Sequence, residues 1–304
     1  GRQVVLLAGP PGSGKSTTVD ILIAALEKSA RPLYVIKDCP KFEEPLHLLP
    51  RHLRAEVEKS LGVHIEGDLC PPCQDRLKKD FTDPDGVVRW HDVPVVIFSF
   101  SERGGRGISY FEPSGEKSED VTKLTGRENT GVTQMPSRGY NDPYAYDLSG
   151  AIPKAERGLC EGRELLSSDP EVLGVFFSVA QERELKITNS TFPQISVDTL
   201  VIGHTNLTPF KKFAGDKNFE GLHRRFYIIP WPYALRIKDE LAIYKKLIER
   251  ESDFVALQTC HIAPGALELA ATFAVMTRLV SSQKGVGLLT KAKVYNGDVL
   301  LTEL

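Results

Sequence analysis

Residues 3–17 read Gln3-Val4-Val5-Leu6-Leu7-Ala8-Gly9-Pro10-Pro11-Gly12-Ser13-Gly14-Lys15-Ser16-Thr17. The first six form an apolar run without polar alternation, which is typical of a strand buried on both faces of a parallel sheet. The next eight match G-x-x-x-x-G-K-[ST], a loop whose backbone N–H groups wrap around nucleotide phosphates. Helical spacing of apolar residues follows at Val19, Leu22, Ile23 and Leu26. This strand–loop–helix order predicts an α/β fold with a nucleotide-binding loop at residues 9–17.

The loop predicts bound ATP with Mg²⁺. The Lys15 ammonium is expected to reach the β- and γ-phosphate oxygens, and the Ser16 hydroxyl is expected to ligate the magnesium ion. The helix that follows turns its positive end toward the anion. A glycine-rich turn with no ligand is the plain structural alternative, but the buried run before the loop and the amphipathic helix after it favour a nucleotide site.

The rest of the chain divides by pattern. Strand-like runs recur at residues 33–36, 95–98, 199–203 and 226–229. Residues 102–147 are rich in Gly, Ser, Pro, Asp and Thr, which predicts an inserted set of loops. From residue 236 the apolar pattern becomes helical without strands. We therefore expect a P-loop α/β core with a parallel sheet over residues 1–232, followed by a smaller helical lid domain and the start of a C-terminal region over residues 233–304.

The charge balance limits the classes of partner. Lys and Arg total 38 against 40 Asp and Glu, a formal net charge of −2. No global basic field draws the chain to nucleic acid, so that partner is not expected. No apolar run approaches the roughly 18 residues that a membrane span requires, and the N-terminus lacks the layout of a secretory signal. We expect a cytoplasmic protein without membrane contact.

Cysteine spacing suggests a metal site. The chain has 5 cysteines, too sparse a set for a disulfide framework. Cys70-Pro71-Pro72-Cys73 has the C-x₂-C spacing of a zinc knuckle, and Cys39 and His47 could complete a tetrahedral set. A single C-x₂-C pair is also compatible with reduced thiols or with a disulfide, so these alternatives stay open beside structural zinc.

Two further segments resemble parts of AAA+ ATPases. The first is Thr199-Leu200-Val201-Ile202-Gly203-His204-Thr205-Asn206, which is similar to the sensor-1 strand. The resemblance implies that Asn206 orients the attacking water; a cap at the strand end is the alternative. The second is Leu222-His223-Arg224-Arg225-Phe226, which resembles the segment whose arginine reaches the ATP of a neighbouring subunit. Arg225 is the candidate finger and Arg224 the alternative, and a solvated basic pair is the plain interpretation.

Three more candidates follow from this resemblance. Arg278 lies where sensor-2 arginines occur, although an exposed helix arginine has the same pattern. Residues 155–164 align with the segment that usually closes in a strand followed by Asp-Glu. Here Arg163 stands in place of the Asp, Glu164 falls on the catalytic glutamate position, and Glu161 is the other acidic group close by. The missing Asp weakens the case for magnesium ligation by this segment. Carboxylates on a helix surface are the alternative for both glutamates.

Several segments resemble the PrkA family of bacterial serine protein kinases more closely than AAA+ proteins in general. They are Cys39-Pro40-Lys41-Phe42-Glu43-Glu44-Pro45-Leu46-His47-Leu48-Leu49-Pro50, Ile65-Glu66-Gly67-Asp68-Leu69-Cys70-Pro71-Pro72-Cys73, Gly203-His204-Thr205-Asn206 and His261-Ile262-Ala263-Pro264. The similarity runs along essentially the whole chain and is limited to the AAA+ part of that family. It implies a larger protein, with a helical N-terminal segment and a C-terminal region that bears the kinase assignment.

The resemblance implies an ATPase module that forms a ring, a hexamer, and regulates or drives an attached activity on protein substrates. That activity is serine phosphorylation for the full-length protein, or remodelling and unfolding of proteins for degradation. A monomeric small-molecule P-loop kinase is the competing class, but it explains neither the order of Asn206 and Arg225 nor the helical last third. The bilobal-kinase motifs H-R-D-x-x-x-x-N and D-F-G are missing from the chain. The glycine-rich stretch Arg103–Gly107 suits a loop that contacts substrate or a simple turn.

Overall fold

The computed structural model describes residues 3–113, 121–187, 194–216, 220–251, 261–280 and 285–300. The chain divides into two compact units. The first comprises Gly1–Gly9 and Gly14–Pro230, and the second comprises Pro10–Ser13 and Trp231–Leu304. Each unit has its own apolar core and is described separately below.

A parallel sheet organises the first unit. Among the described residues it has five strands, ordered β11 (Phe226–Pro230), β1 (Val4–Ala8), β10 (Leu200–Thr205), β7 (Leu159–Gly162) and β4 (Ile108–Phe111). Each neighbouring pair is parallel. Val4, Leu6 and Leu7 of β1 are buried, as their unbroken apolar run predicts for a central strand. Because the strands are parallel, all five carboxyl ends lie at the same edge of the sheet.

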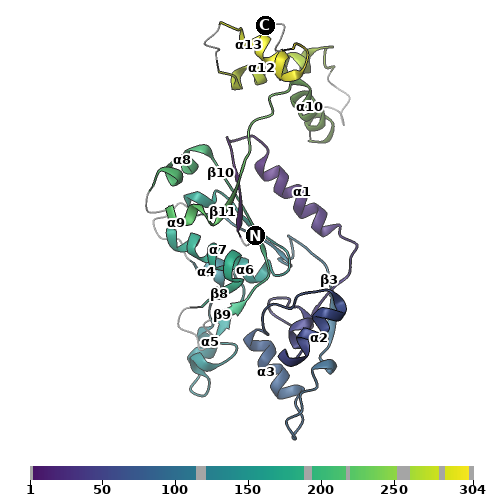
Figure 1. Cartoon of the computed structure of the whole chain (residues 1–304), viewed down its shortest axis with the longest axis vertical. Coiled ribbons are helices and arrows are strands. Elements are labelled where there is room, and N and C mark those ends of the chain that lie inside the picture. The colour runs from purple at the N-terminus through teal and green to yellow at the C-terminus, as the bar shows by residue number, and fades with distance from the viewer. Residues whose placement is uncertain are drawn as a thin grey trace. The chain divides into compact units, whose positions relative to one another are not determined.

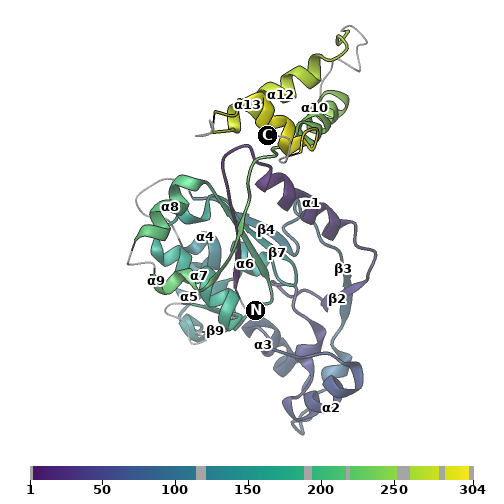
Figure 2. The same cartoon turned by 45° about the horizontal axis from the view of Figure 1, so that its top comes forward.

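Helices cover both faces of this sheet. Helix α1 (Lys15–Glu27) lies on one side and α7 (Pro170–Glu182) on the other (Figure 1, Figure 2). Phe176 and Phe177 of α7 are fully buried, and the Phe177 ring packs edge-on against Phe226 of β11 with centroids 4.9 Å apart. On α1 only Lys15, Val19 and Ile23 are buried. Leu22, expected on the apolar face, is 43% exposed because the helix contacts the sheet along a narrow stripe.

The strands differ from the predicted sheet in one respect. β2 (Leu33–Ile36) and β3 (Val95–Phe98) exist where predicted, but they pair with each other in a separate antiparallel sheet. Their places in the main sheet are taken by β4 and β7. β4 lies inside residues 102–147, which were expected to be loops, so that expectation is wrong for this strand. Both strands carry polar or exposed residues that hide them in the sequence, such as Ser109 and Glu161.

A second apolar cluster lies around the end of β2 and the first turn of the helix α3 (Pro71–Asp80). Its buried members include three cysteines and are Ile36, Cys39, Leu48, Cys70, Cys73, Val93, Leu148, Ile187 and Ile195. The helix α2 (Arg51–Leu61) has no buried residue. Short elements complete the first unit: η1 (Pro45–Leu48), η2 (Trp90–Asp92), α4 (Thr122–Thr125), β5 (Arg127–Glu128), α5 (Thr130–Thr133), η3 (Gly139–Asn141), β6 (Tyr146–Asp147), α6 (Ala151–Lys154), η4 (Leu165–Ser167), β8 (Glu184–Lys186), β9 (Gln194–Ser196), α8 (Leu207–Gly215) and α9 (Glu220–His223).

The second unit is helical after Trp231. Its described helices are α10 (Ile237–Glu251), α12 (Ala266–Arg278) and α13 (Leu288–Asn296). Ile237, Ala271, Val275 and Ala292 form its buried core, and the small alanines let the three helices approach closely. Across the described part of the chain, every helix is too short or too polar to cross a bilayer.

Candidate functional site

The glycine-rich loop joins β1 to α1. Gly12 and Gly14 have φ of +72° and +86°, in the left-handed region where a side chain would strain the backbone. Gly14 precedes the first residue of α1, so the amides of the first helical turn open toward the loop. The Gly9 N–H donates to the Thr205 carbonyl at 3.2 Å and ties the loop to β10. These features fit a phosphate-binding loop.

Lys15 and Ser16 begin α1. Ser16 and Thr17 are exposed at its first turn, whereas Lys15 is only 6% exposed. The Lys15 ammonium donates to the Gly9 carbonyl at 2.9 Å and to Asn206 Oδ1 at 3.2 Å. Burial lowers the pKa of Lys15, and the negative charge of Glu164 opposes that shift.

Asn206 and Glu164 meet beside this lysine. Asn206 follows the last residue of β10 and donates through Nδ2 to Glu164 Oε1 at 2.9 Å. Glu164 comes two residues after the end of β7. Lys15, Asn206 and Glu164 therefore form one hydrogen-bonded chain at the carboxyl edge of the sheet, although they lie far apart in sequence. The sequence nominated all three, and the structure places them together.

The backbone at Glu164 is unusual. Its φ and ψ are 43° and 42°, a left-handed conformation that few residues other than glycine adopt. The turn directs a half-buried carboxylate toward Asn206 and starts the short helix η4. Backbone strain of this kind costs about 1–3 kcal/mol and is found preferentially at functional sites.

Glu161 belongs to a separate group. It lies in β7 with no exposed area, and its carboxylate contacts His204 Nε2 at 3.1 Å and accepts from Arg163 Nε at 2.9 Å. Burial would raise the pKa of Glu161, but these two hydrogen bonds outweigh burial and lower it. The Arg163 guanidinium also stacks over the Tyr110 ring at 4.3 Å. For Glu161, the alternative of a helix-surface carboxylate is wrong, since Glu161 is a buried strand residue.

His204 was not singled out from the sequence. It is buried in β10, and its Nδ1 has no hydrogen-bond partner among the described residues. The period-2 alternation along residues 200–206 was the available signal, because it places His204 and Asn206 on the same side of one strand.

The two candidate fingers lie just before β11. Arg225 is half-buried with its guanidinium 5.7 Å from the centre of the Phe177 ring, and Arg224 is exposed. Within the part of the chain that the structure describes, neither arginine pairs with a carboxylate. The Arg225 carbonyl accepts from Val4 N–H at 3.0 Å, which anchors its backbone to β1.

In the second unit, Arg278 ends α12 and forms a bidentate ion pair with Glu240 of α10, both N–O distances being 2.8 Å. Its guanidinium also donates to the Ala234 carbonyl and stacks on Tyr233 at 4.9 Å. Arg278 is therefore a paired side chain, not the exposed helix arginine of the alternative interpretation. Trp231 of the same unit donates to the Ser13 carbonyl at 3.1 Å, a loop contact that the sequence did not indicate.

The predicted metal ligands are brought together with one change. Cys39, Cys70, Cys73 and Glu43 are buried, and their ligand atoms all lie within 4.8 Å of one another. His47 is not in this group, so the predicted set is wrong at that position. Its Nδ1 contacts the Glu43 carboxylate at 3.2 Å and its Nε2 contacts the Glu66 carbonyl at 2.9 Å. The four described cysteines are free, which removes the disulfide alternative for them.

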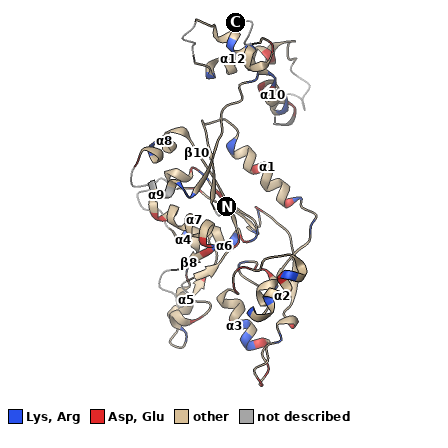
Figure 3. Ribbon diagram, in the orientation of Figure 1, with Lys and Arg blue, Asp and Glu red and all other residues tan. Residues whose placement is uncertain are grey.

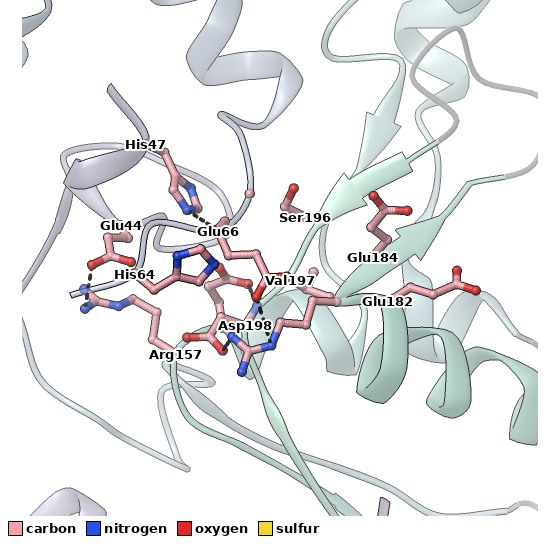
Figure 4. Close-up of a pocket in the computed structure, with 13 residues that line it drawn as sticks. Glu44, His47, His64, Glu66, Arg157, Glu182, Glu184, Ser196, Val197 and Asp198 are labelled. Carbon is pink, nitrogen blue, oxygen red and sulfur yellow. Dashed lines mark hydrogen bonds and ion pairs between the residues drawn. The ribbon is translucent and has the colours of Figure 1, made fainter. Parts of the chain in front are cut away.

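A cavity of about 130 Å³ lies elsewhere in the first unit. Its two arginines contact carboxylates. Arg157 pairs with Glu44 (Figure 4), and Arg183 pairs with Glu66 and Asp198. None of its described lining residues belongs to the phosphate loop. Basic and acidic residues are interspersed along the described chain (Figure 3), as the near-zero net charge predicts. The Arg103–Gly107 stretch is a closed turn, with paired backbone hydrogen bonds between Ser101 and Arg106.

Solved structures resemble the chain weakly. A complex of magnesium chelatase subunits BchI and BchD has a TM-score of 0.49 with 13% identity, covering 91% of this chain and 67% of that one. NtrX from Brucella abortus in complex with ADP has a TM-score of 0.43 with 12% identity, covering 97% of this chain and 45% of that one.

Sequence comparison is more specific. The chain is 37% identical over 303 residues to "ATP-dependent protease PrkA" of Bacillus subtilis (strain 168), covering 98% of this chain and 46% of the relative. It is 27% identical over 310 residues to "Serine/threonine kinase YeaG" of Escherichia coli (strain K12), covering 98% of this chain and 45% of that relative. The chain thus spans about half the length of these curated relatives. A family model described as the PrkA AAA domain matches residues 1–286. This chain therefore belongs to the PrkA AAA domain family, and its fold is that of an AAA+ P-loop module.

Proposed function

We propose that this chain binds ATP with Mg²⁺ and hydrolyses it. The observation that supports this most is the hydrogen-bonded chain from Lys15 through Asn206 to Glu164 at the carboxyl edge of the sheet. That edge is where parallel α/β sheets bind their ligands. A lysine, an amide and a carboxylate in contact there provide a phosphate contact, a water-orienting group and a base.

The residues have distinct roles in this proposal. Bound MgATP supplies the γ-phosphoryl group and a cation that offsets its negative charge. Lys15 contacts the phosphate oxygens, and Ser16, exposed at the first turn of α1, ligates magnesium. Asn206 orients the attacking water, and Glu164 accepts its proton while holding the Asn206 amide in place.

The position of Arg163 bears on the rate. Arg163 stands where the family pattern has an Asp, so this position has no carboxylate that could bind magnesium. The Arg163 guanidinium pairs with Glu161. Glu161 is also committed to His204. Magnesium ligation in this chain therefore rests chiefly on Ser16, and we infer that hydrolysis is slow.

We further propose that the chain works as a ring, a hexamer, in the cytoplasm. Arg225 would complete the site of a neighbouring subunit, since its guanidinium has no carboxylate partner among the described residues and only the Phe177 ring is recorded near it. Arg278 would act only after leaving its bidentate pair with Glu240. Ring assembly gives each ATP site a residue from the next subunit, as AAA+ modules require.

The whole protein would use this ATPase to drive an attached activity on protein substrates. The names of the relatives point in two directions, a protease and a serine/threonine kinase. Both act on proteins, so a protein substrate is the shared element of the proposal. The kinase assignment would apply to the full-length protein, and the remodelling role is the second candidate because the relative that is 37% identical is named a protease.

Isothermal titration calorimetry with MgATP tests the binding step. The chain is expected to bind, and Lys15→Ala is expected to bind much more weakly because the phosphate charge loses its cation. Lys28→Ala, an exposed lysine just past the other end of α1, is the matched control. Absence of binding by the wild-type chain, or equal binding by the Lys15 variant, would contradict the proposal. Size-exclusion chromatography with a non-hydrolysable ATP analogue then tests the ring, which a persistent monomer would exclude.

A further inference from the structure

We propose that Cys39, Cys70, Cys73 and Glu43 bind a structural zinc ion. These four residues are buried, and their three sulfurs and one carboxylate oxygen lie within 4.8 Å of one another. They come from two segments that are distant in sequence and from two different local structures. The proposal concerns the apolar cluster around β2, β3 and α3 and does not depend on the nucleotide site.

The sulfur spacing is that of ligands around an ion. Cys39 Sγ and Cys70 Sγ are 3.8 Å apart, far longer than a disulfide bond of about 2.05 Å. Tetrahedral zinc with Zn–S bonds of about 2.3 Å places two thiolates about 3.8 Å apart. Glu43 Oε2 lies 3.9 Å from Cys39 Sγ. A zinc ion with Zn–O of about 2.0–2.2 Å would draw these two atoms slightly closer, to about 3.6 Å.

Local structure presents the two pairs of ligands to each other. Cys70 immediately precedes α3 and Cys73 lies in its first turn, which Pro71 begins, so both sulfurs lie at the start of one helix. Cys39 follows β2, and the Glu43 N–H donates to its sulfur at 3.4 Å. The Cys70 N–H donates to both oxygens of Glu43, at 3.0 and 2.9 Å. The backbone therefore fixes the carboxylate against the cysteines.

Besides the Cys70 N–H that they share, the two oxygens of Glu43 face different partners. Oε2 faces the Cys39 sulfur, while Oε1 contacts the His47 ring at 3.2 Å and the Lys41 ammonium at 3.6 Å. His47 also contacts the Glu66 carbonyl through Nε2, as Figure 4 shows. Both ring nitrogens of His47 thus point at oxygen atoms, so His47 contacts the Glu43 carboxylate and is not itself a ligand of the proposed ion. This is the outer-shell contact that protein metal ligands usually have.

The surrounding charges suit an anionic metal centre. Zn²⁺ with three thiolates and one carboxylate carries a net charge of about −2, which is costly to bury unless cations are close. Lys41 and Glu43 have no exposed side-chain area, and Lys41 and His47 both contact the Glu43 carboxylate. The Lys41 ammonium, which also pairs with Glu156 at 2.9 Å, offsets part of this negative charge. Soft thiolates in a closed, buried set favour zinc in a structural role over the oxygen-binding cations.

The alternative is a cluster of reduced thiols in an apolar core. Buried cysteines often pack in this way, and the neighbours Ile36, Val93 and Ile195 are apolar. A thiol core alone, however, gives no reason for a fully buried carboxylate with an oxygen facing one of the sulfurs. The zinc proposal accounts for the sulfurs and the carboxylate together.

Metal analysis of the native chain tests the proposal. Purified without chelators, the chain is expected to contain about one zinc ion, and Cys73→Ser to contain much less. Cys160→Ala is the matched control, because Cys160 is a buried free cysteine in β7 that lies outside the cluster. Loss of zinc from the Cys160 variant as large as from the Cys73 variant would overturn the proposal.

Cobalt substitution of the unmutated chain makes the test independent of whether a variant folds. Co²⁺ bound to three thiolates gives intense sulfur-to-metal charge-transfer bands and the visible bands of a tetrahedral ion, and the absence of both would overturn the site. Glu43→Gln is expected to abolish Co²⁺ binding at the site from which Zn²⁺ displaces it. His47→Gln should weaken Co²⁺ binding at this site by about 10–100-fold. The reverse order would exclude Glu43 as a ligand.

Discussion

Glu164→Gln removes one charge from the proposed site and keeps its shape. Glu164 Oε1 accepts a hydrogen bond from Asn206 at 2.9 Å, and the amide oxygen of Gln accepts the same bond. Asn206 and Lys15 therefore keep their contact at 3.2 Å. Two things are lost: the base that takes a proton from water, and the negative charge that opposes the lowering of the Lys15 pKa by burial.

The magnitude follows from the role of the carboxylate. A positioned general base contributes about 10²–10⁴ to a rate, so loss of Glu164 is expected to slow ATP turnover by about 10²–10³-fold. This is about 3–4 kcal/mol of transition-state stabilisation. Because Glu164 contacts Asn206 and not the loop backbone, ATP affinity is expected to change by less than about threefold, so kcat falls while KM is retained.

A coupled-enzyme assay of phosphate release, together with calorimetry of MgATP binding, measures the two parts. Glu171→Gln, a first-turn exposed glutamate of α7, is the matched control and is expected to keep full turnover. Turnover of the Glu164 variant within about threefold of wild type would remove Glu164 from the chemistry. A large loss of ATP affinity would instead assign it to nucleotide binding.

Three further predictions concern other residues. Mixing Arg225→Ala with Lys15→Ala, each inactive alone, should restore up to about a quarter of wild-type turnover if the arginine acts in a neighbouring subunit; no restoration contradicts a trans role. Arg278→Met leaves Glu240, 4% exposed, without its cation and should destabilise the helical unit by about 2–4 kcal/mol in urea unfolding, with partial recovery in the double variant with Glu240→Gln. Burial raises the pKa of Glu156 from 4.5 to about 7, although Lys41 opposes this shift. Because the pKa of Glu156 is higher in the folded state than in the unfolded state, protonated Glu156 stabilises the fold. This stabilisation is complete below about pH 4.5 and is lost as the pH rises through about 7. It amounts to at most about 3 kcal/mol of the free energy of unfolding. Glu156→Gln should flatten the pH dependence of urea unfolding in that window, and an unchanged slope argues against a protonated Glu156.

The parts of the fold that depend on local sequence were predictable. The phosphate loop needs glycines at fixed spacing, and Gly12 and Gly14 have the left-handed φ that only glycine adopts freely. β1 and α1 flank it with the expected apolar patterns. Asn206 and Glu164 were nominated one at a time by their resemblance to AAA+ segments, and their mutual hydrogen bond follows from the order of β10 beside β7.

Strand pairing was not predictable from apolar runs alone. Leu33–Ile36 and Val95–Phe98 have the hydropathy of sheet strands, but nothing in that hydropathy says which partner each strand takes. β4 and β7 pair in the main sheet and yet contain polar residues, because Glu161 and Ser109 find partners inside the fold. A buried polar residue with a tertiary partner looks like a loop residue in the sequence.

The residues of the proposed zinc site show the same limit. The C-x₂-C spacing of a zinc knuckle identified Cys70 and Cys73. Cys39 and His47 were added because they lie nearby in sequence, and Glu43 was not considered. The choice between His47 and Glu43 depends on tertiary contacts: the Cys70 N–H and Lys41 hold the Glu43 carboxylate beside the sulfurs, and His47 packs behind it.

At Glu164, the residue that would best stabilise the left-handed backbone differs from the residue that the proposed ATP hydrolysis needs. Glycine or asparagine would adopt φ of 43° more easily, so selection for solubility or heat resistance should enrich those residues there. Selection for ATP consumption should retain glutamate despite its strain. Variant libraries of this chain selected for heat resistance and for ATP consumption would therefore differ at position 164. They would agree at buried core positions such as Phe176 and Leu173, where the same packing serves both selections.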